Sequence, residues 1–380
     1  MLANNKKTIL VIVALALLAP GFNAAQATPD QAAAIERLLK RAPNSYESHL
    51  KAGHFYLKEG SIGQAQDEFK SAIKCKNPGS EAFKQLALLY MRSQDYVESN
   101  KVIEQAVKLF PREYGVFLTA GYVMHNQSKL DEALIYYNKA AALQPQNAEI
   151  YLAKADLLNA MNKYQEALAT LDKAKALGHL SKPAEALLHF VRAKVYNNTS
   201  RYGDAAAELN INYKADPESL NNNKLYLVVL DKLGKKQKEL EVALIILSAD
   251  NGQRMQERKA LIGGLIKTLS QSQIEASLKA AESLIKAKQF KARMHFAMGD
   301  IMDRQARYKD AIQEYRRGLA INPDFARGYL RLGEDLEMAQ NDFEGAMLNY
   351  KKALALDSKD KETKMRIKAL SEKQKKQKSK

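Results

Sequence analysis

The chain has 380 residues, of which 46% are hydrophobic, and this content excludes a wholly disordered protein. Its 59 lysines and arginines exceed its 43 aspartates and glutamates, which gives a formal net charge of +16. The one cysteine, Cys75, excludes an intrachain disulfide framework and a cysteine-rich metal site, and the scarcity of proline (9 residues) favours helices.

The N-terminal residues have the pattern of a secretory signal. Lys6 and Lys7 precede an apolar run at residues 9–19, and residues 25–27 (AQA) form a small-residue cleavage site. The run is too short to cross a bilayer, which takes about 20 residues. We therefore expect residues 1–27 to be removed and the mature protein to be periplasmic or secreted. The alternative is an inner-membrane anchor formed by an uncleaved N-terminal segment.

A repeat with a fixed period follows a short helical stretch. Residues 28–45 are expected to form a capping helix, and the repeating part begins at residue 46. Two sets of small residues recur at a spacing of 34: Gly53, Ala87, Gly121 and Ala155, and also Ala65, Ser99, Ala133 and Ala167. Such self-similarity predicts an array of identical structural units.

The unit at residues 114–147 shows the pattern in full. Phe117 and Gly121 fall on one face of a first helix, and Ala133 and Tyr137 fall on one face of a second helix. Small side chains let the two helices approach closely, and the tyrosine fills the remaining gap. A proline near the end of the unit cannot continue the second helix, so it separates one unit from the next.

This pattern resembles the tetratricopeptide repeat, a 34-residue helix–turn–helix motif. Matching units begin near residues 46, 80, 114, 148, 186, 292 and 326. The resemblance implies an all-α, right-handed superhelical solenoid of tandem repeats that forms one continuous array. It places repeats 1 to 4 at residues 46–185, a fifth at 186–219 and further repeats at 292–358.

Residues 220–291 keep the length of two repeats but lose their signature. Residues 225–233 and 240–247 can form one helical pair, and residues 260–269 and 274–285 can form another. We therefore expect degenerate helical-pair repeats here.

The C-terminal residues 359–380 are strongly basic, with ten lysines and arginines against three acidic residues. A polar capping helix is expected at residues 360–370, followed by a disordered tail. The tail either keeps the protein soluble or tethers it to an anionic envelope surface. Its lysines are Lys373, Lys375, Lys376, Lys378 and Lys380. Nucleic acid would attract the same charge, but the export signal argues against that partner.

The resemblance also implies a binding groove, because the first helices of such repeats line a concave surface. Carried over position by position, the groove candidates are His54, Lys58, Lys84, Arg92, Tyr122, His125, Asn126, Asp156, Asn159, Lys194, Asn197, Asp300, Asp303 and Arg304. Their charge changes from basic to acidic along the chain, which would orient an extended partner. Lys84 matches the lysine of the family's carboxylate clamp, but Leu88 replaces the clamp asparagine, so no clamp is expected.

No catalytic motif occurs in the sequence. It contains no glycine-rich phosphate loop, dinucleotide-binding motif or nucleophile elbow, so we expect no enzyme, no cofactor and no metal site. His49, His189 and His295 share one repeat position that faces the partner helix, which predicts packed core residues. His54 and His125 lie on the groove side instead, where a pH-sensing or ligand role is open.

Three functions are compatible with this sequence. The first is a non-enzymatic, exported scaffold that binds a peptide or helix of a protein partner, and neither nucleic acid nor a small-molecule substrate. The second is an accessory of envelope assembly or secretion, held at an anionic surface by the basic tail. The third is an enzyme with an atypical site in residues 220–291. The array and the missing catalytic motifs favour the first.

Overall fold

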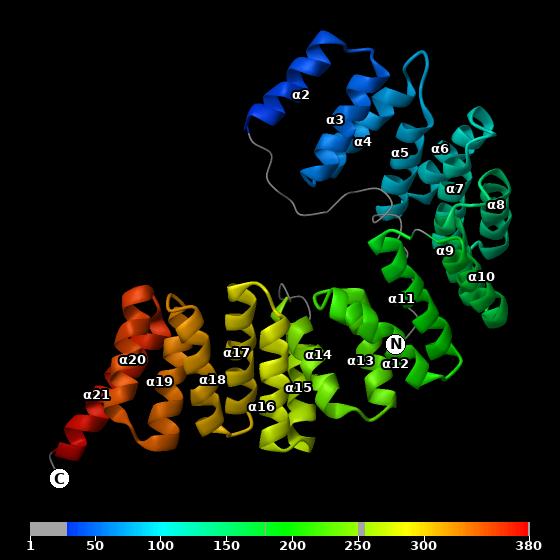
Figure 1. Ribbon diagram of the computed structural model, residues 1–380. Coiled ribbons are helices and arrows are strands. Elements are labelled where there is room, and N and C mark those ends of the chain that lie inside the picture. Colours follow the sequence, from blue (N-terminus) through cyan, green and yellow to red (C-terminus); the bar gives the residue numbers. More distant parts are fainter. Residues whose placement is uncertain (1–28, 179, 250–254, 379–380) are drawn as a thin grey trace. The chain divides into compact units, whose positions relative to one another are not determined.

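A computed structural model describes residues 29–178, 180–249 and 255–378 (Figure 1). The described residues form twenty helices and no strand, which confirms the predicted all-α class. The expected N-terminal signal lies outside them. The described residues fall into two compact units that divide between Thr199 and Ser200. We call them the N-terminal and the C-terminal unit.

The helices alternate with short turns in both units. Those of the N-terminal unit are α2 (Pro29–Arg41), α3 (Tyr46–Lys58), α4 (Ile62–Ile73), α5 (Ser80–Arg92), α6 (Tyr96–Leu109), α7 (Tyr114–Asn126), α8 (Leu130–Leu143), α9 (Ala148–Ala160), α10 (Tyr164–Ala176) and α11 (Lys182–Asn198). Those of the C-terminal unit are α12 (Tyr202–Ala215), α13 (Leu220–Lys232), α14 (Lys236–Ser248), α15 (Met255–Thr268), α16 (Gln271–Leu284), α17 (Lys288–Asp303), α18 (Tyr308–Ile321), α19 (Ala326–Gln340), α20 (Phe343–Leu356) and α21 (Lys361–Lys378). The first four repeats therefore begin at the predicted residues.

The turn inside each repeat contains one residue in the left-handed backbone conformation. Gly60, Gln94, Ser128 and Asn162 have φ angles of 75°, 63°, 64° and 60°, and they follow one another at the repeat spacing of 34. In the C-terminal unit Ala306 takes the same role with a φ of 57°. The turn requires this backbone conformation at one residue. Residues other than glycine adopt it here, but glycine would do so with less strain.

Ala306→Gly is therefore expected to stabilise the protein. Glycine reaches the left-handed region without a clash of its Cβ, so we expect the free energy of unfolding to rise by roughly 0.5–1 kcal/mol. Ala320→Gly, on an exposed face of α18, is the matched control and should lower it by a similar amount. Urea denaturation of both variants measures this. Destabilisation by both substitutions would contradict a left-handed turn at residue 306.

Between the two helices of a repeat, a small residue of the first helix packs against a larger residue that lies 16 positions later in the sequence. A Cβ on Gly299 would lie 2.5 Å from Cε1 of Tyr315, and Gly53 meets the ring of Phe69 in the same way. Where the small residue is Ala155, the position of the ring is taken by the aliphatic Leu171. Thus glycine accompanies an aromatic ring and alanine accompanies a smaller side chain, which keeps the packed volume nearly constant.

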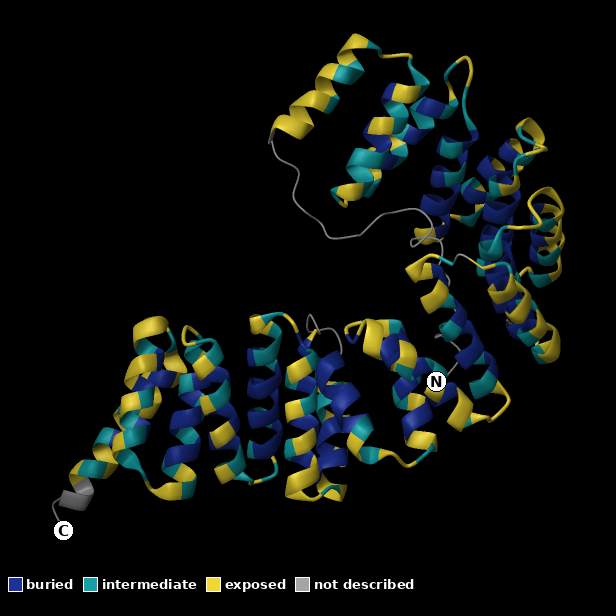
Figure 2. Ribbon diagram, in the orientation of Figure 1, coloured by how far each residue is buried: buried dark blue, intermediate teal, exposed yellow. Residues whose placement is uncertain are grey.

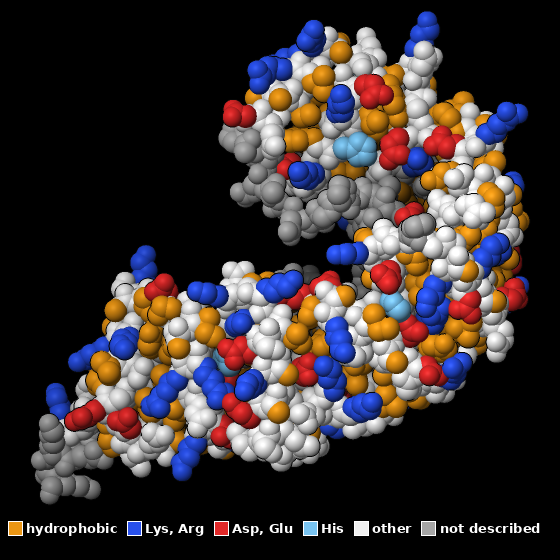
Figure 3. Space-filling model, in the orientation of Figure 1, with side chains coloured by type: hydrophobic (Ala, Val, Ile, Leu, Met, Phe, Trp, Pro, Cys, Tyr) orange, Lys and Arg blue, Asp and Glu red, His pale blue; other side chains and the backbone are white. Residues whose placement is uncertain are grey.

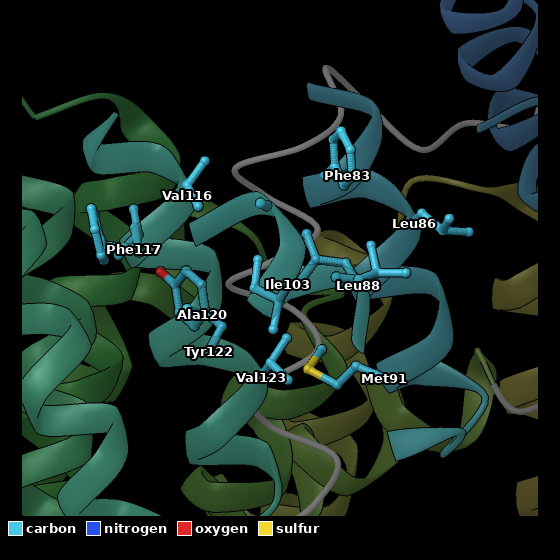
Figure 4. Packing of buried hydrophobic residues seen from close by; sticks show 14 of the residues in the cluster. Phe83, Leu86, Leu88, Met91, Ile103, Val116, Phe117, Ala120, Tyr122 and Val123 are labelled. Atoms are coloured by element: carbon cyan, nitrogen blue, oxygen red, sulfur yellow. The ribbon is translucent and has the colours of Figure 1, made fainter. Parts of the chain in front are cut away.

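First helices and second helices form two different layers of the N-terminal unit. α5 packs against α7 and α7 against α9, and Met91 and Val123 point toward each other between them in Figure 4. Within residues 46–176 the second helices α4, α6, α8 and α10 do not pack against one another in this way. The first helices are accordingly buried on most sides (Figure 2). They form the inner surface, and the second helices form an outer surface with gaps between them.

The degenerate region differs from its prediction in one respect. α13 and α14 pack as the expected pair, but α15 and α16 do not pack as a second hairpin and each lies against α14 instead. The cause is the sequence of α14, whose residues 239–248 are all buried. Residues 242–247 of α14 are all apolar, and a helix segment of this kind needs neighbours all around it. α13, α15, α16 and α17 supply them.

Three boundaries also differ from those predicted. α11 begins at Lys182 and carries Pro183 in its first turn, where proline is tolerated, so it starts before the predicted unit at residue 186. The boundary between the two compact units falls after α11 and thus divides the predicted fifth repeat. α21 continues to Lys378, well beyond the predicted end at residue 370.

Candidate functional site

The predicted groove residues differ widely in their exposure. Those that are buried are Tyr122, His125, Asp156 and Asn159. Those that are half-buried are His54, Lys84, Asn126, Lys194, Asn197, Asp300 and Asp303. Those that are exposed are Lys58, Arg92 and Arg304. All but the three from α17 and its C-terminal end belong to the N-terminal unit, so the prediction of one set becomes two separate sets.

Five of these residues form a buried polar cluster on α7, α9 and α11: Tyr122, His125, Asp156, Asn159 and Lys194. The ammonium group of Lys194 forms an ion pair with the carboxylate of Asp156. Asp156 is only 5% exposed. Asn198 of α11 donates a hydrogen bond of 2.9 Å to Oδ1 of Asn159. Polar contacts thus join α9 to α11 and hold the cluster in one arrangement.

The electrostatics of the cluster are those of a dry interior. Burial lowers the pKa of His125 to about 4, against the opposing attraction of Asp156, so its imidazole is neutral at pH 7. Lys194 keeps the pKa of Asp156 below its usual range despite burial. The hydroxyl groups of Tyr122 and Tyr137 are buried and have no hydrogen-bond partner in the described structure. We conclude that the cluster is internal and cannot present all its polar groups to a ligand.

Lys84 is held within the N-terminal unit in a similar way. Its ammonium group lies 2.8 Å from the carboxylate of Glu81 and 3.5 Å from that of Glu113, which precedes α7. These acidic neighbours raise the pKa of Lys84 in spite of burial. Ser80 donates a hydrogen bond of 2.5 Å to Glu113 as well. Lys84 therefore ties α5 to the start of α7.

The candidates of the C-terminal unit lie beside an acidic group on α19. Asp300 accepts a hydrogen bond of 2.9 Å from the hydroxyl of Tyr315 and lies 2.5 Å from the ammonium group of Lys259. Arg304 donates to the side chain of Gln256 at 3.2 Å. Burial and the neighbouring carboxylate of Asp303 raise the pKa of Asp335 to about 8. Asp335 therefore holds a proton at neutral pH, beside the side chain of Asp303.

The predicted tail is partly built into the C-terminal unit. Lys373 of α21 lies 3.3 Å from the carboxylate of Glu337 and 4.5 Å from the ring centre of Phe343. Lys375 is exposed. The side chains of Lys376 and Lys378 lie outside the described residues, and so does all of Lys380. Helix α21 packs on α20 and extends to Lys378, so it includes most of the residues for which a disordered tail was predicted.

Histidine–glutamate pairs were missed by the sequence analysis. Nδ1 of His295, which is 1% exposed, lies 2.7 Å from Oε2 of Glu314. His49 and Glu68 form the same contact at 2.7 Å. Both histidines are packed inside their repeats, as predicted. The spacing of 19 residues in each pair, which recurs at residues 189 and 208, was the available signal.

Candidate metal sites and membrane-spanning helices are both absent from the described ranges. Within them, no group of three or more histidine, cysteine, aspartate or glutamate side chains is placed to hold a metal ion. Across the same residues, no helix is both long and apolar enough to cross a membrane. Lysines and arginines are spread over the visible face of both units rather than gathered in one patch (Figure 3).

Stacked helical hairpins with repeated closing residues define an α-helical repeat protein. The sequence pattern of the tetratricopeptide repeat family matches residues 84–148, 152–219 and 269–326, which together make up half of the chain. The chain belongs to the tetratricopeptide repeat family, as its sequence predicted. Proteins of this family are generally scaffolds for protein–protein interaction.

Its relatives are distant. Anaphase-promoting complex subunit 3 of Schizosaccharomyces pombe is 20% identical over 182 residues, which are 48% of this chain and 27% of that protein. A TPR repeat-containing protein of Methanocaldococcus jannaschii is 23% identical over 353 residues, 84% of this chain and 59% of that protein. The chain thus spans about a quarter of the first and three-fifths of the second. A thermophilic TPR protein from Thermus thermophilus matches with a TM-score of 0.43 and 19% identity, over 49% of this chain and 99% of that one.

Proposed function

We propose that the protein is an exported scaffold that binds an extended peptide or a helix of a partner protein on the inner surface of its N-terminal unit. Export is inferred from the signal pattern of residues 1–27, where two lysines precede an apolar run and an AQA site. Fewer of the candidate residues are available to a partner than the sequence suggested. The buried polar cluster and Lys84 already form ion pairs or hydrogen bonds within the unit.

Lys58 and Arg92 carry this proposal. They are the last residues of the first helices α3 and α5, they are exposed, and they lie 34 residues apart at the same repeat position. Helix α4 packs against both α3 and α5, and packed helices lie roughly 10 Å apart. Alternate side chains of an extended peptide repeat about every 7 Å, so two acidic residues near this spacing can contact both cations. The half-buried His54 lies on α3, one turn before Lys58.

The double substitution Lys58→Glu/Arg92→Glu tests this surface. We expect it to reduce the recovery of partner proteins from an envelope extract at least about tenfold, because two exposed attractions become repulsions. Lys163→Glu/Lys175→Glu makes the same charge change at exposed positions of α10 and its N-cap, and it should recover the partners normally. Quantitative mass spectrometry after affinity capture measures both. Equal recovery by the two variants would contradict binding at the inner surface.

Tethering by the basic tail is the weaker candidate. It would require the tail lysines to face an anionic surface, and Lys373 is engaged by Glu337 and Phe343 instead. Lys375 is exposed and keeps its charge available. Each lysine that faced such a surface would contribute about 1 kcal/mol, so the engagement of Lys373 within the unit weakens the proposed tether by that amount.

A further inference from the structure

A groove of about 680 Å³ lies on the outer surface of the N-terminal unit, between the second helices α4 and α6 and over the first helix α5. It follows from the layer arrangement, since α4 and α6 each pack more extensively against α5 than against each other. α4 has 12 residues and ends at Ile73, whereas α6 has 14, so the wall on the α4 side is the shorter one. None of the proposed inner-surface residues lines this groove.

The floor of the groove is apolar. It is formed by Phe83, Leu86 and Tyr90 of α5, which are 3%, 1% and 9% exposed. On the α6 side Leu109 is 57% exposed, although it is a large hydrophobic residue next to this floor. A partner that covered it would remove apolar surface from water and gain roughly 25 cal/mol for each Å².

The rim of the groove is basic. Four lysines line it, against the single acidic residue Glu98: Lys70, Lys74, Lys101 and Lys108. Lys101 is 63% exposed in its side chain and lies 3.5 Å from Glu98. Lys70 is 40% exposed and lies 3.5 Å from Asp67. Such exposed ion pairs contribute little, about 0–1 kcal/mol, so these lysines can exchange them for a partner's carboxylates.

The groove has the length of a short helix. A second hollow of about 500 Å³ adjoins it and shares Lys101, Gln105 and Lys108, and there Val97 is 77% exposed. Along α6 the lining extends from Glu98 to Leu109, which is about 16 Å at 1.5 Å per residue. This is the length of three helical turns.

We propose that this outer groove is a docking site for an acidic amphipathic helix of a partner protein. The apolar side chains of such a helix, at i, i+3, i+4 and i+7, would cover the aromatic floor while its acidic residues meet the lysine rim. The chain's own N-terminal segment does not suit the groove, because residues 1–28 contain Lys6 and Lys7 and no acidic residue. The site is separate from the proposed inner surface, and either can exist without the other.

A synthetic probe tests the proposal on the full chain. The probe is a fluorescent 15-residue helix with leucines at i, i+3, i+4 and i+7 and glutamates flanking them, and its counterpart carries lysines in place of the glutamates. We expect the acidic probe to bind in fluorescence anisotropy, with an affinity that falls as salt rises. Lys101→Glu/Lys108→Glu should weaken it at least about tenfold and favour the basic probe, whereas Lys163→Glu/Lys175→Glu should not.

Three results would overturn the proposal. The first is an acidic probe that binds both variants and the unchanged protein equally, or not at all. The second concerns vesicles of phosphatidylcholine and phosphatidylglycerol. If Lys101→Glu/Lys108→Glu lost binding to these vesicles but still bound the probe, the groove would be assigned to a lipid surface. The third is a dimer in analytical ultracentrifugation that this variant abolishes, which would make the occupant a second copy. A probe that binds normally to Lys58→Glu/Arg92→Glu separates this site from the inner surface.

Discussion

Gly121→Ala is expected to lower the free energy of unfolding by about 2 kcal/mol, although alanine is the better helix former. A Cβ at this position would collide with the ring of Tyr137, which is fully buried and cannot move aside. Gly63→Ala is the matched control, because nothing lies within 4 Å of a Cβ there. It should raise the free energy of unfolding by roughly 0.5–1 kcal/mol. Urea denaturation measures both changes.

A second substitution should rescue the first. The chain itself combines Ala155 with Leu171 at the equivalent positions of the fourth repeat. Tyr137→Leu alone leaves a cavity, but in Gly121→Ala/Tyr137→Leu the new methyl group occupies part of that space. We expect the double variant to be at least about 1 kcal/mol more stable than the sum of the two single effects. Strict additivity would contradict the pairing of sizes inside the repeats.

Asp335→Asn is expected to stabilise the protein in alkaline solution. The pKa of Asp335 is raised to about 8 in the folded chain, mainly by burial and then by Asp303, against about 3.9 in an unfolded chain. Between these values the folded state binds more protons than the unfolded state, so the free energy of unfolding falls as pH rises from 4 to 8. The asparagine carries no charge at any pH and therefore removes this fall.

The expected size of this effect is at least about 3 kcal/mol at pH 8, since one pKa unit corresponds to about 1.4 kcal/mol. Unfolding by urea at several pH values between 4 and 9 measures it for both proteins. Glu344→Gln removes an exposed carboxylate of α20 and should leave the pH profile unchanged. A parallel fall in stability of the unchanged protein and of Asp335→Asn would show that residue 335 holds no extra proton.

Much of the fold could be predicted because its features are local. The spacing of 34 residues located the start of each early repeat, and small residues such as Gly121 marked where two helices approach. The left-handed turn residues followed the same period, but only the first of them, Gly60, is a glycine, so the conformation of Gln94, Ser128 and Asn162 was not evident from the residue types. The packing of α15 and α16 on α14 was missed, since hairpins were assumed from sequence order and not from the all-round apolar character of α14.

The candidate site was less predictable, because exposure depends on how closely the first helices stack. Tyr122 and Asp156 occupy the inner repeat positions as expected, but packing of α7 between α5 and α9 buries them. Lys58 and Arg92 stay exposed because they end their helices. The outer groove could not be located either. Its lysines come from α4 with its C-cap and from α6, and the packing of both helices on α5 brings them together.

Photo-crosslinking in intact cells tests the central claim, that the protein holds a protein partner on its inner surface. A photoreactive side chain would replace Arg92 in one variant and Lys163 of the turn before α10 in a second, both of which are exposed. We predict that the variant at position 92 yields a distinct crosslinked band that contains a partner protein, and that the variant at position 163 does not. No crosslink at position 92, or the same products from both positions, would contradict the account.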